Sequence, residues 1–321
     1  MAINIITSLK QKVKKSKLTK QLLSLPLIVI FLWLIVFFLE PRFFSSENFS
    51  NLGRQMTIIS IVAIGQTVVI ITKGIDLSVG SVVGLASVLS ALMFASNMNP
   101  IIVIALTVFT GILIGLFNGM LVYNAQITPF IVTLGTMTIF RGVTLVVSKG
   151  QIVSGVPREV SSIAEGSFLG IPNLFIVLLA VSLIGVIMLN YTVFGRNAFS
   201  IGSSQESALL SGVNVRDTTY GAYMFSGATS SLAGALLTLR LASGVPTAGT
   251  AYELDAIAAS VIGGASLFGA QGSIIGTVLG STIMTTLKNA GNLLGIQPFW
   301  LQIATGLLLI IVVFFDQIRK R

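Results

Sequence analysis

The sequence predicts an all-α integral membrane protein with about ten membrane-spanning helices. Its mean hydropathy is +0.96, and 54% of its 321 residues are apolar. Only 9% are charged, whereas about a quarter of the residues in a typical soluble protein are. The net charge of +9 comes from lysines and arginines beside apolar runs, a position that orients a membrane protein and does not indicate a nucleic-acid partner.

The first span is predicted at residues 22–39, after a cytoplasmic segment, residues 1–21, that carries six lysines. A basic flank before an apolar run also describes a signal peptide. This run has no small-residue cleavage site, and Glu40, Pro41 and Arg42 follow it directly. We therefore expect an uncleaved span with the N-terminus in the cytoplasm.

Nine further runs approach the roughly 20 apolar residues that a helix needs to cross ~30 Å of hydrocarbon. The third and eighth spans are the weakest, and the eighth is short enough to be re-entrant or broken. The spans predicted after the first lie at 54–72, 78–95, 101–123, 128–147, 171–190, 217–239, 254–268, 272–290 and 298–315.

The distribution of lysine and arginine tests this topology. Ten spans place both chain ends in the cytoplasm, with twelve basic residues inside, six outside and Arg141 within a span. This two-to-one bias agrees with the positive-inside rule. We therefore expect one transmembrane domain, residues 22–318, in the cell membrane, with a cytoplasmic C-terminus at residues 319–321.

The loop at residues 191–216 is predicted to face the cytoplasm. It contains a short amphipathic helix from Gln205 to Leu210, which Ser211 and Gly212 should end because glycine suits the position after a helix C-terminus. A helix there without a membrane-length apolar run is suited to docking a soluble partner.

Two stretches of the chain echo each other. Shifting residues 74–87 by 179 positions aligns Asp76 with Asp255 and Ser81 with Ser260, and gives six identities in twelve positions. Spans 2–5, about residues 54–147, would then match spans 7–10, about residues 217–315. Because matched spans are five apart, the halves should be inverted in the membrane, as in many transporters, with the pathway between them.

Two further landmarks recur in the same order. An Ile-x-Pro-Phe tetrad occurs at residues 127–130 and again at 296–299. Before each tetrad stands a row of small residues, which lets helix backbones approach closely. Chance similarity between glycine-rich membrane helices is the alternative explanation of the repeat. The predicted helix-packing glycines are Gly111, Gly115 and Gly119 on span 4 and Gly272, Gly276 and Gly280 on span 9.

A few charged residues stand within or beside the spans, where a charge at the bilayer centre costs about 2.5–3.5 kcal/mol. Asp76 and Asp255 each precede a small-residue helix, so they could cap backbone N–H groups, line a polar vestibule or meet a partner chain. With Ser81, Glu253 and Ser260 they are candidates for the translocation pathway or its gate.

Two basic residues near outer span ends have structural interpretations. We expect Arg141 to extend outward or to pair with an acid outside, with a place on the pathway as the alternative. Lys288 is expected to anchor the flank of span 9.

Several function classes are excluded by what the sequence lacks. Without cysteine or histidine there is no disulfide, thiolate nucleophile, histidine base or cysteine/histidine metal site. Ten scattered acids make a carboxylate metal site a poor alternative, so we predict neither metal nor cofactor. No G-x-x-x-x-G-K-[ST] motif is present, so the chain is not expected to hydrolyse ATP by itself.

From about residue 50 to its C-terminus the chain resembles permease subunits of bacterial monosaccharide ABC importers, and the ribose-type permeases most. Four stretches carry the resemblance: residues 74–81 (GIDLSVGS), 133–143 (TLGTMTIFRGV), 211–215 (SGVNV) and 246–268 (PTAGTAYELDAIAASVIGGASLF). The glycines from Gly272 onward continue it.

The cytoplasmic loop follows the family pattern in part. It departs from that pattern at Ser203, Ser204 and Ser207. The resemblance implies that the loop carries the helix that couples the permease to an ATPase. The residues that match the pattern are Gly195, Arg196, Gly202, Ser211, Gly212 and Val215.

The resemblance further implies a complex with ATP-binding subunits in the cytoplasm, an extracytoplasmic sugar-binding protein and a second permease chain, within membrane lipid. The leading hypothesis is the membrane subunit of an ATP-driven importer of ribose. Another monosaccharide, a furanosyl signal molecule or a nucleoside as cargo, and an ion-coupled secondary sugar carrier, are the alternatives. An integral-membrane enzyme has little support, because no acid pair on facing helices is evident.

Overall fold

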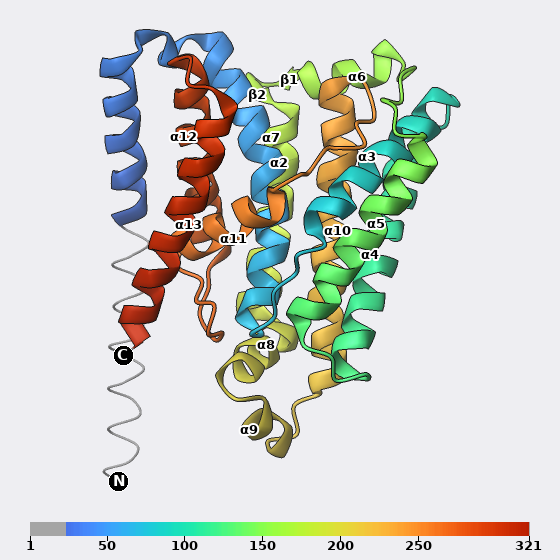
Figure 1. Cartoon of the computed structure of the whole chain (residues 1–321), viewed down its shortest axis with the longest axis vertical. Helices are drawn as coiled ribbons and strands as arrows, with labels where there is room; N and C mark the ends of the chain where they lie inside the picture. Colours follow the sequence, from blue (N-terminus) through green and yellow to red (C-terminus); the bar gives the residue numbers. More distant parts are fainter. Residues whose placement is uncertain (1–23, 321) are drawn as a thin grey trace.

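A computed structural model describes residues 24–320, and the predicted N-terminal segment, residues 1–21, lies outside the described residues. The described chain is a bundle of helices that run roughly along one axis (Figure 1). Its elements are a helix at Ser24–Leu39, the 3-10 helix η1 (Pro41–Phe44), α2 (Ser46–Ile71), α3 (Val79–Ala95), α4 (Pro100–Tyr123), α5 (Pro129–Ser148), α6 (Arg158–Glu165), β1 (Ser167–Phe168), β2 (Ile171–Pro172), α7 (Asn173–Tyr191), α8 (Val193–Ser203), α9 (Gln205–Leu210), α10 (Val215–Leu241), α11 (Tyr252–Ile262), α12 (Ile274–Leu293) and α13 (Pro298–Lys320).

Each predicted span overlaps one of these helices. We name the end of the bundle that carries α8 and α9 the lower end, and the end that carries α6 the upper end (Figure 1). The short antiparallel hairpin of β1 and β2, also at the upper end, is the one departure from helix among the named elements of the described chain. Both tetrad prolines open a helix, Pro129 in α5 and Pro298 in α13, as suits a residue whose missing N–H would have no partner there.

Among the described helices, five are long and apolar enough to cross a membrane: α2, α4, α5, α7 and the Pro298–Ile318 part of α13. The helices α10 and α12 are also long, at 27 and 20 residues, but they carry many small polar residues. Most of these are buried against neighbouring helices, so they do not face lipid and need not be apolar.

The third and eighth spans are the irregular ones. The helix α3 has 17 residues and α11 only 11. The eighth predicted span, 254–268, is helical only as far as Ile262, where α11 ends, which agrees with the expectation that this short run could be broken. Gly263 caps α11, and Gly264 follows with φ +97°, a left-handed conformation that glycine adopts without strain.

Close backbone approach holds α4 against α10, which lies inside the bundle. A methyl group added at Gly111 would overlap the carbonyl oxygen of Gly227, and one added at Gly115 would overlap that of Tyr223. Gly119 is less crowded, since an added methyl would lie 3.0 Å from the Tyr220 Cα.

The second glycine row is divided between two places. Gly272 precedes α12, because Ser273 is the N-cap and accepts a hydrogen bond from the Gly276 N–H (3.3 Å). The prediction that all three glycines share one helix is therefore wrong for Gly272, which lies against Ile71 of α2. Gly276 and Gly280 are in α12 and face α11, where an added methyl at Gly280 would overlap Ala259.

Candidate functional site

Two non-helical segments enter the bundle from opposite ends. Residues 72–78 rise from the lower end to α3, and residues 242–251 descend from the upper end to α11 (Figure 1). They meet at the first turn of α3, where a methyl group added at Gly249 would overlap the carbonyl oxygen of Gly80. Because the first N–H groups of a helix lack partners within it, the starts of α3 and α11 bring hydrogen-bond donors inside the protein.

Asp76 lies in the lower segment and is 1% exposed. Its Oδ1 accepts hydrogen bonds from the Ser78 N–H (3.0 Å) and the Ser78 hydroxyl (2.5 Å). Its Oδ2 accepts one from the Ser226 hydroxyl of α10 (2.8 Å). The predicted capping role is therefore partly right: Asp76 closes the turn before α3, although Ser78 is the N-cap residue, and it also ties that turn to α10.

The groups around Asp76 are neutral. Asn118 of α4 donates to the Ser78 hydroxyl (2.9 Å). The Gln66 amide, turned so that its nitrogen faces the Asp76 carbonyl, bonds to both backbone groups of Asp76 (3.0 and 3.3 Å). Within the described chain, no lysine or arginine pairs with Asp76, and the buried Tyr223 hydroxyl beside Gly74 has no partner.

Asp255 has a different environment. It lies inside the first turn of α11, whose N-cap is Ala251, so the prediction that it caps this helix is wrong. Its own N–H bonds to the Ala251 carbonyl (3.2 Å), and its Oδ2 accepts from Lys288 Nζ of α12 (2.5 Å). The Lys288 side chain is 26% exposed and turned to this acid, so the prediction of a flank anchor is also wrong.

Arg141 turns inward from α5 and holds the upper segment. Its Nη1 donates to the carbonyl oxygens of Pro246 and Ala248 (both 2.9 Å), and its Nη2 to that of Gly80 (3.3 Å). The prediction that it extends outward or pairs with an outside acid is therefore wrong. The cause is that residues 242–251 run non-helically inside the protein and present carbonyl oxygens that no helix satisfies.

The remaining predicted pathway residues serve local contacts. The Glu253 carboxylate packs against Gly80. Ser81 is buried and donates to the Ser78 carbonyl (2.8 Å). Ser260 is buried as well, donates to the Ala256 carbonyl (2.7 Å) and accepts from Thr67 of α2 (2.9 Å).

At the lower end, α8 and α9 form a compact loop. The predicted helix from Gln205 to Leu210 is confirmed as α9, and Gly212 follows it with φ +76°. Ser211 caps α9, and its hydroxyl donates to the Ser207 carbonyl (2.8 Å). Leu209 and Leu210 are exposed, so α9 presents an apolar edge away from the bundle.

The other loop residues anchor this unit. Gly195 packs against the Leu189 backbone. Gly202 packs against the backbone of Ile71, at the end of α2, and that of Ala270. Arg196 is exposed and donates to the Thr192 carbonyl (3.3 Å). Val215 opens α10 and is buried with Ile201 and Ala208.

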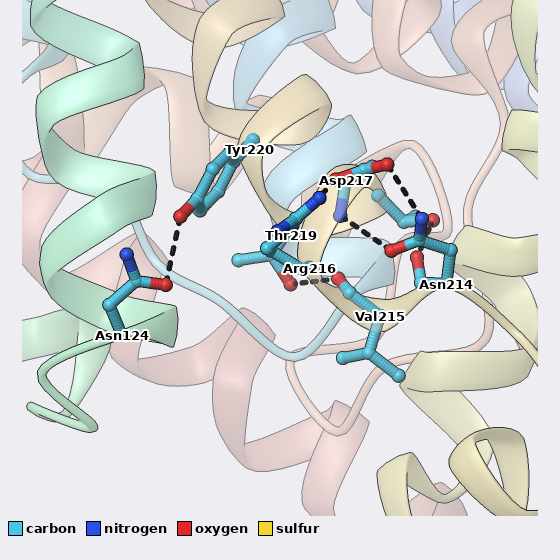
Figure 2. Close-up of polar contacts among 8 residues, drawn as sticks. Asn124, Asn214, Val215, Arg216, Asp217, Thr219 and Tyr220 are labelled. Carbon is cyan, nitrogen blue, oxygen red and sulfur yellow. Dashed lines mark hydrogen bonds and ion pairs between the residues drawn. The ribbon is translucent and has the colours of Figure 1, made fainter.

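Polar contacts fix the start of α10 beside this loop (Figure 2). The Asn214 side chain accepts from the Asp217 N–H (3.1 Å) and so caps α10. Arg216 pairs with the Asp217 carboxylate (2.9 Å). The Tyr220 hydroxyl reaches across to Asn124 at the end of α4 (2.8 Å), so α10 and α4 are joined at their lower ends as well as along their glycines.

Comparison with known proteins identifies the family. Residues 48–313 match the family described as branched-chain amino acid transport system / permease component. This chain belongs to that family. As a permease component it is a multi-pass protein of the cell membrane, which agrees with its long apolar helices.

Relatives of this permease align over most of its length. It is 42% identical to the ribose import permease of Bacillus subtilis over 286 residues, 88% of this chain and 89% of the relative. It is 37% identical to the ribose import permease of Escherichia coli K12 over 290 residues, 89% and 90% of the two chains. It is 35% identical to the galactose/methyl galactoside import permease of Haemophilus influenzae over an alignment of 329 positions that covers 96% of this chain and 97% of the relative. No solved structure matches it.

Besides the inward bonds of Arg141, sequence reasoning missed two contacts made by the buried acids of this permease. The Lys288–Asp255 pair had a signal, since an acid and a base in neighbouring spans are expected to find each other. The hydrogen bond from Ser226 to Asp76 had no signal in the sequence, because Ser226 is one of many small polar residues in α10.

Proposed function

We propose that this permease is the membrane subunit of an ATP-driven importer of a monosaccharide, with ribose as the first candidate. Relatives named as ribose import permeases, 37–42% identical over about nine-tenths of the chain, are the observation that carries this proposal. Relatives named for galactose and for D-allose, at 34–35% identity, favour another monosaccharide as the second candidate.

The pathway or its gate is proposed to lie where residues 72–78 meet residues 242–251. Membrane transporters place substrate sites at interrupted helices, because irregular backbone is tolerated where it lines a cavity. Three observations support this place: two buried acids, two helix starts inside the bundle and an arginine on backbone carbonyls. The residues proposed to act here are Asp76, Ser81, Glu253, Asp255 and Ser260.

Two inverted halves are part of the proposal. The helices α2 and α10, which would be equivalent, run in opposite directions between the lower and upper ends (Figure 1). The irregular spans with α3 and α11 each follow them, as an inverted repeat requires.

The lower end is proposed to face the cytoplasm and to receive ATP-binding subunits on α8 and α9. The coupling residues would be Gly195, Arg196, Gly202, Ser211, Gly212 and Val215. A sugar-binding protein would dock at the upper end, a second copy of this chain would complete the pathway, and lipid would surround the exposed apolar helices. ATP binding would then drive transport by favouring one arrangement of the two halves.

Affinity purification of this chain from its native membrane, with mass spectrometry of what accompanies it, tests the proposal. The purified material is then placed in lipid vesicles and supplied with radiolabelled ribose. We expect a co-purifying ATP-binding subunit and uptake that depends on ATP. A chain that purifies alone and moves ribose without ATP would refute the proposal and favour an ion-coupled carrier.

A further inference from the structure

Three chain segments cross at Gly202, the next-to-last residue of α8. A methyl group added at Gly202 would overlap both the carbonyl oxygen of Ile71 and the backbone nitrogen of Ala270. These two groups also bond to each other, with the Ala270 N–H donating to the Ile71 carbonyl (2.9 Å). Because Gly202 has no side chain, the α8 backbone touches both segments directly.

Two more residues complete this arrangement. A methyl group added at Gly269 would lie 2.7 Å from the Gly202 carbonyl oxygen, and Gly269 has φ +82°. Lys73 donates from Nζ to the Ser203 carbonyl (3.2 Å). We name Ile71, Lys73, Gly202, Gly269 and Ala270 the lower crossing.

The backbone of the lower crossing is strained. Lys73 has φ +65° and Ala270 has φ +57°, both in the left-handed region that favours glycine. A non-glycine residue is disfavoured in this conformation and persists there only where its surroundings impose it, often at sites that switch conformation. Two such residues at one crossing indicate that the surrounding contacts fix this geometry closely.

The lower crossing joins the loop to both irregular spans. From Ile71 the chain continues through Asp76 into α3, and Ala270 lies in the segment that leaves α11 (Figure 1). On the other side, α9 begins at Gln205, three residues after Gly202. Cavities of about 620 Å³ and 280 Å³ border the crossing, each lined in part by Lys73, so its neighbours are not packed against it on every side.

We propose that the lower crossing transmits movement of α8 and α9 to α3 and α11 together, with Gly202 and Gly269 as positioning residues for transport. Direct contact between backbones leaves no flexible side chain to absorb a displacement of α8. A shift there therefore moves the entry to one irregular span and the exit from the other in the same step. This role rests on the proposed function, in which α9 receives the ATP-binding subunit.

The physical link can be tested on the purified chain alone by hydrogen exchange of backbone amides. In Gly202→Ala the added methyl pushes α8 from both segments, so we expect faster exchange in residues 71–76 and in residues 263–271. The matched control is Gly306→Ala, because Gly306 lies in a helix with open space around its Cα. Faster exchange confined to α8, or in only one of the two segments, would overturn the link.

The transport role is tested in the co-purifying complex, with radiolabelled ribose as the probe. In Gly202→Ala we expect ribose moved per ATP hydrolysed to fall roughly tenfold while ATP hydrolysis continues, which is within the usual range of coupling between sites. A merely structural role would lower uptake and hydrolysis in proportion, and that result would overturn the proposal. If no complex exists, the proposed function fails, whereas the exchange experiment still decides the link.

A second variant serves if Gly202→Ala does not fold. The chain has no cysteine, so Lys73→Cys combined with Ser203→Cys can be joined by a short bis-maleimide without side reactions at native thiols. The proposal expects the joined protein to keep most of its uptake, because α8 and the 71–74 turn move as one unit. Loss of uptake on joining, with the single-cysteine variants unaffected by the reagent, would overturn it.

Discussion

Asp76 and Asp255 occupy corresponding places in the sequence pattern, and both are 1% exposed, yet their charges are stabilised differently. Asp76 accepts three hydrogen bonds from neutral donors on Ser78 and Ser226. Asp255 pairs with Lys288, and its Oδ1 has no partner in the described part of the chain. A buried acid at an irregular helix can thus be stabilised by several neutral donors or by one cation.

The cause lies in where each acid stands relative to its helix. Asp76 lies in the turn before α3. Its carboxylate can therefore accept a hydrogen bond from the backbone N–H of Ser78, two residues further along the chain. Asp255 is inside the first turn of α11, and no backbone N–H of the described residues bonds to its side chain. It therefore depends on a partner from another helix, Lys288 of α12. This difference predicts that removing one partner side chain lowers the free energy of unfolding more at Asp255 than at Asp76.

The largest effect is expected from Lys288→Met, which keeps the length of the side chain and removes its charge. Asp255 would then be a buried charge without a partner, a change that costs about 3–5 kcal/mol. We expect the free energy of unfolding to fall by about 3 kcal/mol, at the lower end because Lys288 is partly exposed. The change in the free energy of unfolding is measured by unfolding the purified protein with increasing SDS in mixed micelles.

The control is the double variant Asp255→Asn with Lys288→Met. With both charges removed, no unpaired charge remains, so most of the lost stability should return. If the double variant is as unstable as the sum of the single ones, the pair does not act as a unit and the contrast with Asp76 is incorrect.

A smaller effect is expected from Ser226→Ala, which leaves Oδ2 of Asp76 without its donor. An unsatisfied buried acceptor costs about 1–3 kcal/mol, and the two bonds from Ser78 to Oδ1 remain. The loss of stability is measured by comparing the thermal unfolding of the detergent-solubilised variant with that of the wild-type protein.

The matched control lies one turn further along the same helix. Ser230 is equally buried, but its side-chain oxygen has no partner among the described residues, so Ser230→Ala should be neutral or stabilising. Equal losses in Ser226→Ala and Ser230→Ala would show that Ser226 acts through packing and not through Asp76.

Local sequence signals predicted much of the fold. Apolar runs located the long helices, and the residues from Gln205 to Gly212 predicted α9 and its end. Each of these depends on groups within one or two turns of the chain. The family and its membrane location followed from motifs that span most of the sequence.

The centre of the protein could not be predicted in the same way. Arg141 turns inward because residues 242–251, about a hundred positions later, present carbonyl oxygens inside the bundle. The pairing of Asp255 with Lys288 depends on α11 and α12 packing side by side, so no local pattern could fix it, although an acid and a base in neighbouring spans were a signal. The predicted repeat was also misleading, because it suggested the same role for Asp76 and Asp255. Asp76 precedes its helix, α3, whereas Asp255 lies inside the first turn of α11.

The smallest effect is expected from Asp76→Asn. Asparagine keeps one oxygen to accept the two bonds from Ser78, and the Ser226 hydroxyl can rotate to accept from the new amide nitrogen. We expect a loss of about 1 kcal/mol or less in the free energy of unfolding, the value of one neutral hydrogen bond.

Asp255→Asn, measured beside it, should lower the free energy of unfolding more, because it leaves the Lys288 ammonium without its carboxylate. If Asp76→Asn is the more damaging of the two, the charge of Asp76 has a partner beyond the neutral donors seen here, such as a second copy of the chain or the transported sugar. Repeating the measurement with ribose present then separates these two, since only the second responds to the sugar.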